Sequence, residues 1–384
     1  MFIKLRNKII GFLYRNILKK IFFRLDPEVV HDRMIKNGVM LGKSGFTRGL
    51  VGLMFRYKNI MLEQDILGIS FKNPIGLSAG FDKNAELTDI LPEVGFGFAE
   101  LGSVTGEPCE GNPKPRLWRL AQQKSLVVYY GLKNDGAVAI AKKLQPKADQ
   151  PRAKKDKKFK IPIGISIAKT NCQKTADLQE GVNDYVKAYR VLQGVGDYVT
   201  INISCPNAFG GQPFTDPTSL TALFTEIFKI QKIKPIFLKL SPDLSIPEVD
   251  ALLAVCCGFP IDGYICSNLT KNRNRSDLAD VQVPEHGGLS GKLVSNLSNN
   301  HIAHIYKKTG GRKVIIGCGG VFDATDAYKK IKNGASLIQM ITGMIFEGPQ
   351  VISEINQGLV ELLESDGYSN ISDAIGANSQ TESL

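Results

Sequence analysis

Eight short apolar runs, separated by longer segments with a helical period, are the feature of this sequence that most restricts its fold. The runs lie at 74–79, 97–104, 163–168, 198–204, 236–240, 263–267, 314–317 and 336–341. Helical spacing of apolar residues falls between most of them, at 85–94, 182–194, 247–257 and 325–333. Buried parallel strands form continuous apolar runs, and eight strands alternating with helices are typical of one closed barrel. The sequence therefore predicts an α/β fold, a (β/α)8 TIM barrel, rather than an open doubly wound sheet.

The first 23 residues predict a basic amphipathic helix. Apolar residues at 9, 10, 13, 17 and 21 fall near helical spacing, with Lys and Arg between them. The apolar run at 9–14 is far shorter than the ~20 residues of a membrane-spanning helix, and no small-residue cleavage site follows it, which argues against a signal peptide. We expect a helix lying on a membrane surface, with the protein peripheral on the cytoplasmic face. A helix packed on the body of the protein is the alternative.

Two more helices precede the first apolar run. Asp26 is a natural N-cap and Pro27 fits the first helical position, so a helix is expected to run to about Leu41, where Gly42 ends it. A second helix is expected over 47–56. The sequence thus predicts three regions: a helical, membrane-associated extension at 1–66, the barrel at 67–364, and a flexible tail at 365–384.

Charge and cysteine usage narrow the possible partners. The 384 residues carry a formal net charge of +11, and much of the excess lies in the first 24 residues and at 147–160. This asymmetry points to an anionic partner surface, either lipid headgroups or nucleic acid. The segment 147–160 is expected to be a flexible surface excursion. Seven cysteines form no CxxC pair or metal-ligand spacing, and His301 with His304 is interpreted as a solvated helix face, so no metal site is predicted.

The loop after the fourth run, Asn202–Asn207, places a thiol between two amides. Catalytic groups of barrel enzymes lie at the carboxyl ends of the strands, so Cys205 is a candidate catalytic residue. A small buried cysteine is the alternative of equal weight. Gly210 and Gly211 follow, and they allow the loop to bend over a ligand.

Glycine-rich turns after the seventh and eighth runs predict a phosphate site. Gly317–Gly320 and Thr342–Gly343 present backbone amides at the position where barrels commonly bind phosphate. Flavin mononucleotide, FMN, is a common ligand of this kind. After the first run, small residues at 78–80 allow a flat ring to approach the backbone.

Two lysines and three asparagines are also expected at or near the carboxyl ends of the strands. Lys239 lies inside a run that faces the barrel, where it could stabilise negative charge on a reduced flavin, and Lys83 could neutralise a substrate carboxylate. A surface lysine is the alternative for each. Asn202, Asn207 and Asn268 end or follow different strands and suit a planar, amide-rich ring.

At this point the sequence resembles the dihydroorotate dehydrogenases, flavoproteins of pyrimidine synthesis. The resemblance covers about 25–349. It lies in 73–83, 114–120, 202–207, 287–291 and 334–339, and the segment 25–31 is similar to the membrane-associated, quinone-reducing class. It implies that a base takes a proton from dihydroorotate, that a hydride passes to FMN, and that quinone reoxidises the flavin.

The resemblance also implies roles for individual residues. Cys205 matches the catalytic base. His31 and Arg119 match the inner end of a quinone tunnel. Residues implied to contact FMN are Ser78, Ala79, Gly80, Asp82, Ser103, Ser166, Asn202, Lys239, Ser267, Gly291, Gly319, Gly320, Ile341 and Thr342. Residues implied to contact the substrate are Lys83, Tyr130, Gly131, Leu132, Asn202, Asn207 and Asn268.

Five positions depart from the pattern of the quinone-dependent class. Cys205 stands where that class carries serine. The soluble class carries cysteine at this place. Val128, Lys133 and Ser166 stand where asparagines are usual, and Leu269 where a small hydroxyl residue is common. A different cyclic amide, or a different electron acceptor, is therefore the first alternative. A non-catalytic flavin carrier is another, as is nucleic-acid binding through 147–160, although no nucleic-acid motif is present and no such partner is expected.

Overall fold

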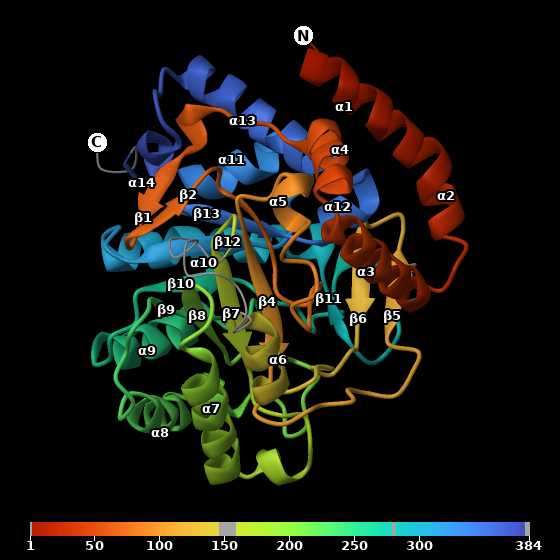
Figure 1. Ribbon diagram of the computed structural model, residues 1–384. Helices are drawn as coiled ribbons and strands as arrows, with labels where there is room; N and C mark the ends of the chain where they lie inside the picture. Colours follow the sequence, from red (N-terminus) through yellow and green to blue (C-terminus); the bar gives the residue numbers. More distant parts are fainter. Residues whose placement is uncertain (1, 146–158, 279–281, 381–384) are drawn as a thin grey trace.

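Residues 2–145, 159–278 and 282–380 are described by the computed structural model of the chain (Figure 1). The expected excursion at 147–160 lies outside these residues except for its last two positions. No helix in the described ranges is long and apolar enough to cross a membrane.

A closed parallel barrel forms the centre of the molecule, so the fold prediction is confirmed. Each of the eight apolar runs contains one barrel strand. In order around the barrel these are β3 (Ile75–Leu77), β4 (Phe98–Val104), β7 (Ile163–Ile167), β8 (Tyr198–Asn202), β9 (Ile236–Lys239), β10 (Gly263–Cys266), β12 (Val314–Cys318) and β13 (Leu337–Met340), with β13 pairing back onto β3.

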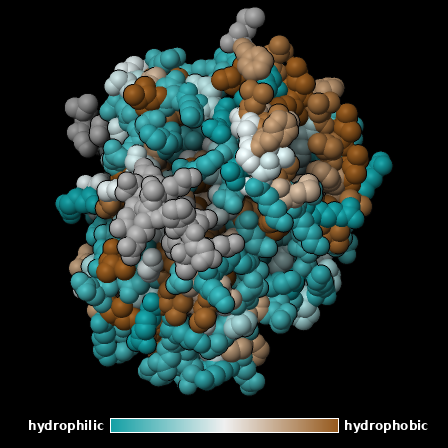
Figure 2. Space-filling model, in the orientation of Figure 1, coloured by the Kyte–Doolittle hydropathy of each residue, from teal (hydrophilic) through white to brown (hydrophobic). Residues whose placement is uncertain are grey.

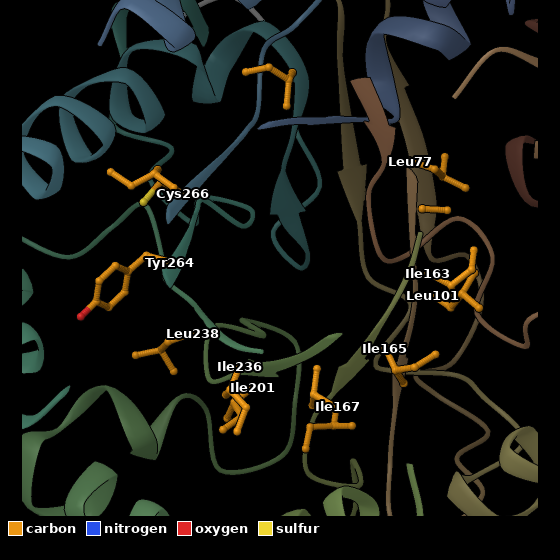
Figure 3. Packing of buried hydrophobic residues seen from close by; sticks show 14 of the residues in the cluster. Leu77, Leu101, Ile163, Ile165, Ile167, Ile201, Ile236, Leu238, Tyr264 and Cys266 are labelled. Carbon is orange, nitrogen blue, oxygen red and sulfur yellow. The ribbon is translucent and has the colours of Figure 1, made fainter. Parts of the chain in front are cut away.

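Side chains alternate in direction along each strand, so the strands contribute to two separate buried layers. Side chains such as Leu77, Leu101 and Ile165 point away from the barrel axis into the layer beneath the helices (Figure 3). Their neighbours point inward, and a second cluster that includes Phe98, Tyr198 and Phe237 fills the barrel interior. A packed interior at one end leaves the other end of the barrel for ligands.

Helices cover the barrel from outside. They are α5 (Leu91–Val94), α6 (Ala137–Leu144), α7 (Leu178–Leu192), α8 (Pro217–Ile227), α9 (Ile246–Cys257), α10 (Ser295–Thr309), α11 (Ala324–Lys332), α12 (Thr342–Glu347), α13 (Val351–Asp366) and α14 (Ala377–Gln380). Aspartates cap three of them: Asp177, Asp216 and Asp323 accept backbone N–H bonds at the starts of α7, α8 and α11.

Two small antiparallel sheets, which the sequence did not indicate, lie outside the barrel. The hairpin β1 (Gln64–Ile66) and β2 (Ile69–Phe71) brings Phe71 against Phe98 at the filled end. The second sheet pairs β5 (Leu117–Leu120) with β6 (Ser125–Val128) and β6 with β11 (Gly288–Leu289). Its side chains form one wall of the cavity described below.

The N-terminal extension is helical, as predicted. Helix α1 (Phe2–Leu13) continues through a π-helical segment (Tyr14–Leu18) into α2 (Lys19–Phe22), and α3 (Pro27–Lys43) and α4 (Gly45–Phe55) follow. Asp26 caps α3, which runs through Gly42 because the bare glycine lets the helix approach Asp89 and Ile90 closely.

One face of the α1–α2 helix is docked and the other is exposed. Asn7 and Arg6 hydrogen-bond Ser353, Tyr14 donates to the Ile345 carbonyl, and Lys4 pairs with Glu361. The opposite face is apolar and exposed, with Phe2, Leu5, Ile9, Phe12, Leu13, Ile17, Leu18 and Ile21. Figure 2 shows the hydrophobic surface gathered over this edge of the molecule.

Three local predictions are wrong. Residues 85–90 are not helical, because the Asp82 carboxylate accepts the N–H groups of Glu86 and Leu87 and holds this segment as a turn. The chain beyond 365 is not loose as far as 380, since Ile371 and Ala374 are fully buried in the core.

The third concerns the histidines of α10. His301 is buried rather than solvated and lies 3.0 Å from the Leu244 carbonyl, while His304 contacts Asp250 at 2.7 Å. Both side chains fix α10 against α9 and the loop that precedes it.

Candidate active site

Two adjoining cavities open at the carboxyl ends of the barrel strands. The larger, about 170 Å³, is bounded by the ends of β3, β4, β8 and β9 and by the β5–β6 wall. The smaller, about 80 Å³, lies over β10, β12 and β13. They share Ala79, Lys239, Asn268, Leu269, Ser290, Ile341 and Thr342, so they form one continuous site.

Nearly all the site residues named from the sequence line this pair of cavities. The larger contains Ala79, Gly80, Lys83, Ser103, Tyr130, Gly131, Leu132, Asn202, Cys205, Asn207, Lys239, Asn268, Ile341 and Thr342. The smaller adds Ser78, Ser267, Gly291, Gly319 and Gly320.

Two of the residues named for FMN do not line it. Asp82 is buried under the β3 loop as a turn cap, and Ser166 lies behind Ser103, with 2.7 Å between their hydroxyl oxygens. Ser103 in turn accepts from the Asn202 amide at 2.8 Å. Both therefore support groups that face the cavity.

The smaller cavity has the chemistry of a phosphate site. Gly319 and Gly320 have φ of +113° and +74°, and a Cβ on Gly320 would lie 2.5 Å from the Ser295 Cβ. The lining also contains Ser267 and Gln339. The Ser267 hydroxyl and the side-chain amide oxygen Oε1 of Gln339 are both buried and without a hydrogen-bond partner in the described structure. Buried polar atoms of this kind are normally satisfied, so they indicate a polar ligand.

Lys239 points into the barrel mouth, as predicted. It is 3% exposed, and its Nζ lies 3.4 Å from the Ser78 Oγ. Both side chains border the place where the two cavities meet. A buried ammonium at this point suits a ligand that carries or gains negative charge.

Lys83 lies at the other end of the larger cavity. Its Nζ is 3.9 Å from the Tyr130 ring centroid. Burial lowers the pKa of Lys83 to about 8, with Asp32 and Glu28 favouring the charged form. Beneath Tyr130, Arg116 makes a bidentate pair with Glu28, and both side chains are buried. This pair holds α3 against the cavity wall.

The three asparagines are held by protein contacts while they face the cavity. Asn202 donates to Ser103, Asn207 to the Val128 carbonyl at 2.7 Å, and Asn268 to the Ser204 carbonyl at 2.8 Å. Each amide nitrogen has two hydrogens, so Asn202 and Asn207 each keep a donor for a ligand, whereas Asn268 also donates to the Ser204 hydroxyl at 3.1 Å. Apolar side chains line the cavity beside these asparagines, namely Pro206, Val128 and Leu269.

Cys205 lines the larger cavity, and it is partly exposed rather than fully buried in the core. Burial raises the pKa of the Cys205 thiol above its ordinary value, while the Asn207 backbone N–H and the Lys169 ammonium oppose the rise. Lys169 was not identified from the sequence, because the stretch after β7 carries no motif of its own; the adjacency of β7 and β8 in the predicted barrel is the signal that could have located it.

A third cavity, about 290 Å³ and mostly apolar, lies between the N-terminal helices and the barrel. It is lined by side chains of α2, α3, α4 and β5. It shares residues with the 170 Å³ cavity that contains Cys205, so the two cavities adjoin there. The shared residues are His31, Phe81, Leu117, Leu126 and Ile345.

His31 lies at this junction and Arg119 in the apolar cavity. The His31 Nε2 is 3.0 Å from the Phe81 carbonyl. Burial, followed by the nearby Lys83 charge, lowers the pKa of His31 to about 4, so this imidazole is neutral at pH 7. Arg119 donates to the Leu25 carbonyl and lies 4.7 Å from the Phe23 ring centroid.

The barrel, the phosphate-type pocket, the adjoining cavity with its lysine, asparagine and cysteine side chains, and the apolar channel suit a (β/α)8-barrel oxidoreductase. The model of the dihydroorotate dehydrogenase family matches residues 61–363. The chain belongs to this family, in which a flavin cofactor is a general property.

The chain is similar to quinone-dependent members of the family. The dihydroorotate dehydrogenase (quinone) of Synechocystis is 38% identical, with 91% of this chain and 93% of the relative covered. The mitochondrial enzyme of Arabidopsis thaliana is 36% identical over 96% of this chain and 83% of its own. A crystal structure of the Eimeria tenella enzyme in complex with ferulenol aligns with a TM-score of 0.81 at 28% identity, covering 92% of this chain and 96% of that one.

Proposed function

We propose that this protein is a dihydroorotate dehydrogenase that oxidises dihydroorotate to orotate and passes the electrons to a quinone. The observation that carries the proposal is one continuous site. A phosphate-type pocket, a cavity that carries Lys83, Cys205 and the asparagines, and an apolar channel adjoin in that order. Two half-reactions with different partners need two compartments beside one redox cofactor.

The cofactor we propose is FMN. Backbone at Gly291, Gly319 and Gly320, with the Ser267 hydroxyl, would hold its phosphate, and Ser78, Lys239 and Asn202 would face the ring system. When bound, FMN supplies a two-electron acceptor for hydride. The Lys239 charge favours the form of that acceptor with more negative charge.

Cys205 is the proposed base. As thiolate it removes a proton from the ring carbon next to the substrate carbonyl, while the hydrogen on the neighbouring carbon leaves with its electron pair. The Asn207 backbone N–H favours the thiolate. Lys83, Asn207 and Asn268 would orient the ring, with Lys83 at its carboxylate.

The apolar channel is the proposed quinone site. His31 stands between the two compartments and is neutral at pH 7, so it contributes a hydrogen-bonding group without placing a charge in the channel. Arg119 offers a donor to a quinone oxygen.

We further propose that the apolar face of α1–α2 lies on a membrane surface. The exposed large side chains run along this helix, and lysines and arginines flank them. Basic residues of this kind suit the anionic leaflet that faces the cytoplasm. Because the channel is bounded by α2, α3 and α4, a lipid-soluble quinone would enter from the same side.

A second candidate function is oxidation of a different cyclic amide. It is favoured by Val128 and Leu269, which place apolar side chains in the cavity beside the asparagines. Each hydrogen bond lost to a ligand costs roughly 0.5–1.5 kcal/mol.

Substrate choice is tested by anaerobic mixing of the flavin-loaded protein with dihydroorotate and, separately, with dihydrouracil, which lacks the carboxylate. Rapid bleaching by dihydroorotate alone supports the first function. Bleaching by dihydrouracil but not by dihydroorotate supports the second.

A further inference from the structure

The loop that carries Cys205 is held from the end of a neighbouring strand. Phe209 lies on this loop with 54% of its surface exposed, yet its backbone is bonded on both sides. Its carbonyl accepts from the Lys169 ammonium, and its N–H donates to the Asn171 Oδ1 at 2.6 Å. Lys169 and Asn171 follow β7, so the fold itself brings them to this loop.

Asn171 connects the same loop to the opposite wall of the cavity. Its amide donates to the Gly131 carbonyl at 3.1 Å and to the Asn112 Oδ1 at 2.9 Å. Asn112 in turn donates to the Asn207 carbonyl at 3.1 Å. The position of the Cys205 loop is therefore set by bonds to the end of β7 and to the cavity wall.

Lys169 is unusual among the groups that hold the loop, because it is charged and only 3% exposed. Among the described residues no carboxylate oxygen lies within 4.0 Å of its Nζ; Asp184, the carboxylate that acts on Lys169, is hydrogen-bonded to Thr170 and to the Gly106 N–H. Burying a lysine without a paired acid is costly. The bond from Lys169 to the Phe209 carbonyl is charge-assisted, and it places a buried ammonium without a paired acid at the loop that carries Cys205.

The thiol of Cys205 is the group that this charge can serve. Lys169 is the principal cation acting on it and the exposed Lys271 the weaker one, while Cys109 acts in the opposite direction. Conversely, Cys205, Cys172 and Asp184 are the groups that favour the charged form of Lys169 against its burial.

We propose that Lys169 is a positioning residue for Cys205: its ammonium group holds the loop 204–211 over the cavity through the Phe209 carbonyl, and its charge stabilises the thiolate. The inference rests on the proposed role of Cys205 as the base. In the reaction the thiolate gains the substrate proton and becomes a neutral thiol, and the ammonium of Lys169 is unchanged.

Four variants separate the two parts of this role. Lys169→Gln keeps a donor for the Phe209 carbonyl and removes the charge, whereas Lys169→Arg keeps both. Asn171→Ala loosens the loop and leaves the charge. Lys174→Met removes a lysine whose side chain is 73% exposed and paired with Glu180, as a control in the same segment.

The readout is alkylation of Cys205 by iodoacetamide as a function of pH, followed by mass spectrometry of the peptide that contains it. For Lys169→Gln we expect the midpoint to rise by about one pH unit, with about tenfold slower alkylation at pH 7. Lys169→Arg and Lys174→Met should match the wild type. Asn171→Ala should react faster at every pH with an unchanged midpoint, because its loop opens more often.

An unchanged midpoint in Lys169→Gln would overturn the inference. If that variant does not fold, a raised midpoint in Lys169→Met supports the inference and an unchanged one overturns it. This readout does not depend on the substrate. Failure of the proposed function would appear separately, as wild-type flavin that dihydroorotate does not reduce.

Discussion

Replacing Cys205 tests the proposed chemistry at the atom where it begins. The structure surrounds this thiol with buried groups, which raise its pKa above the ordinary value of 9.0. With such a pKa, at most about 1% of the thiol is ionised at pH 7. We therefore expect the rate of flavin reduction by saturating dihydroorotate to rise about tenfold per pH unit from pH 7 to 9.

The size of the loss follows from the same role. A positioned general base contributes about 10²–10⁴-fold to a proton transfer, so Cys205→Ala should lower the plateau rate by that factor. Cys205→Ser keeps a hydroxyl in place and should keep part of the rate, without the steep rise with pH.

The assay is anaerobic stopped-flow absorbance of the bound flavin, across about pH 6 to 10. Saturating substrate is needed because Lys83 has a pKa of about 8 in the free protein. Its charge is lost as the pH rises through that value, so substrate affinity should fall there. A plateau rate in Cys205→Ala equal to that of the wild type would refute the reasoning.

Three further predictions concern the apolar channel, the ring cavity and the stability of the fold. Met34→Trp, on the wall of the apolar channel, should slow reoxidation by quinone at least tenfold and leave reduction by dihydroorotate unchanged, whereas Met40→Trp, on the exposed side of the same helix, should change neither half-reaction. Val128→Asn should lower the KM for dihydroorotate by about two- to tenfold, since one hydrogen bond is worth roughly 0.5–1.5 kcal/mol; an unchanged KM would exclude contact with the ring. Glu28→Gln should cost about 3–5 kcal/mol in urea unfolding, because Arg116 is then buried without its partner. Burial opposes the charged form of Glu28, but Arg116 outweighs it and lowers the pKa of Glu28, so the pair should lose its contribution as the pH falls below about 4.5; equal stability of Glu28→Gln and wild type would contradict this.

The barrel could be predicted because its signal is local. Each strand is an apolar run, and the register that follows makes Lys239 and Asn202 point into the barrel mouth. Segments whose structure depends on tertiary bonds were predicted less well. Residues 85–90 have a helical pattern, but Asp82 takes their N–H groups. The segment 371–374 is short and partly polar, yet its Ile371 and Ala374 pack into the core.

Contacts between distant loops limit how much of the site can be predicted from the sequence. The resemblance assigned Ser166 to the flavin, and the structure places Ser103 in front of it. Lys169 lies in a polar stretch with no motif of its own, and it meets the Phe209 carbonyl only because β7 and β8 are neighbours. The barrel makes consecutive strands neighbours, but which side chains of their two loops meet is not visible in the spacing of residues along the chain.

The absorbance spectrum of the purified protein tests the central claim most directly. We predict an oxidised flavin spectrum that bleaches on anaerobic addition of dihydroorotate and returns on addition of quinone. A protein that binds no flavin, or whose flavin stays oxidised in the presence of dihydroorotate, would contradict the account.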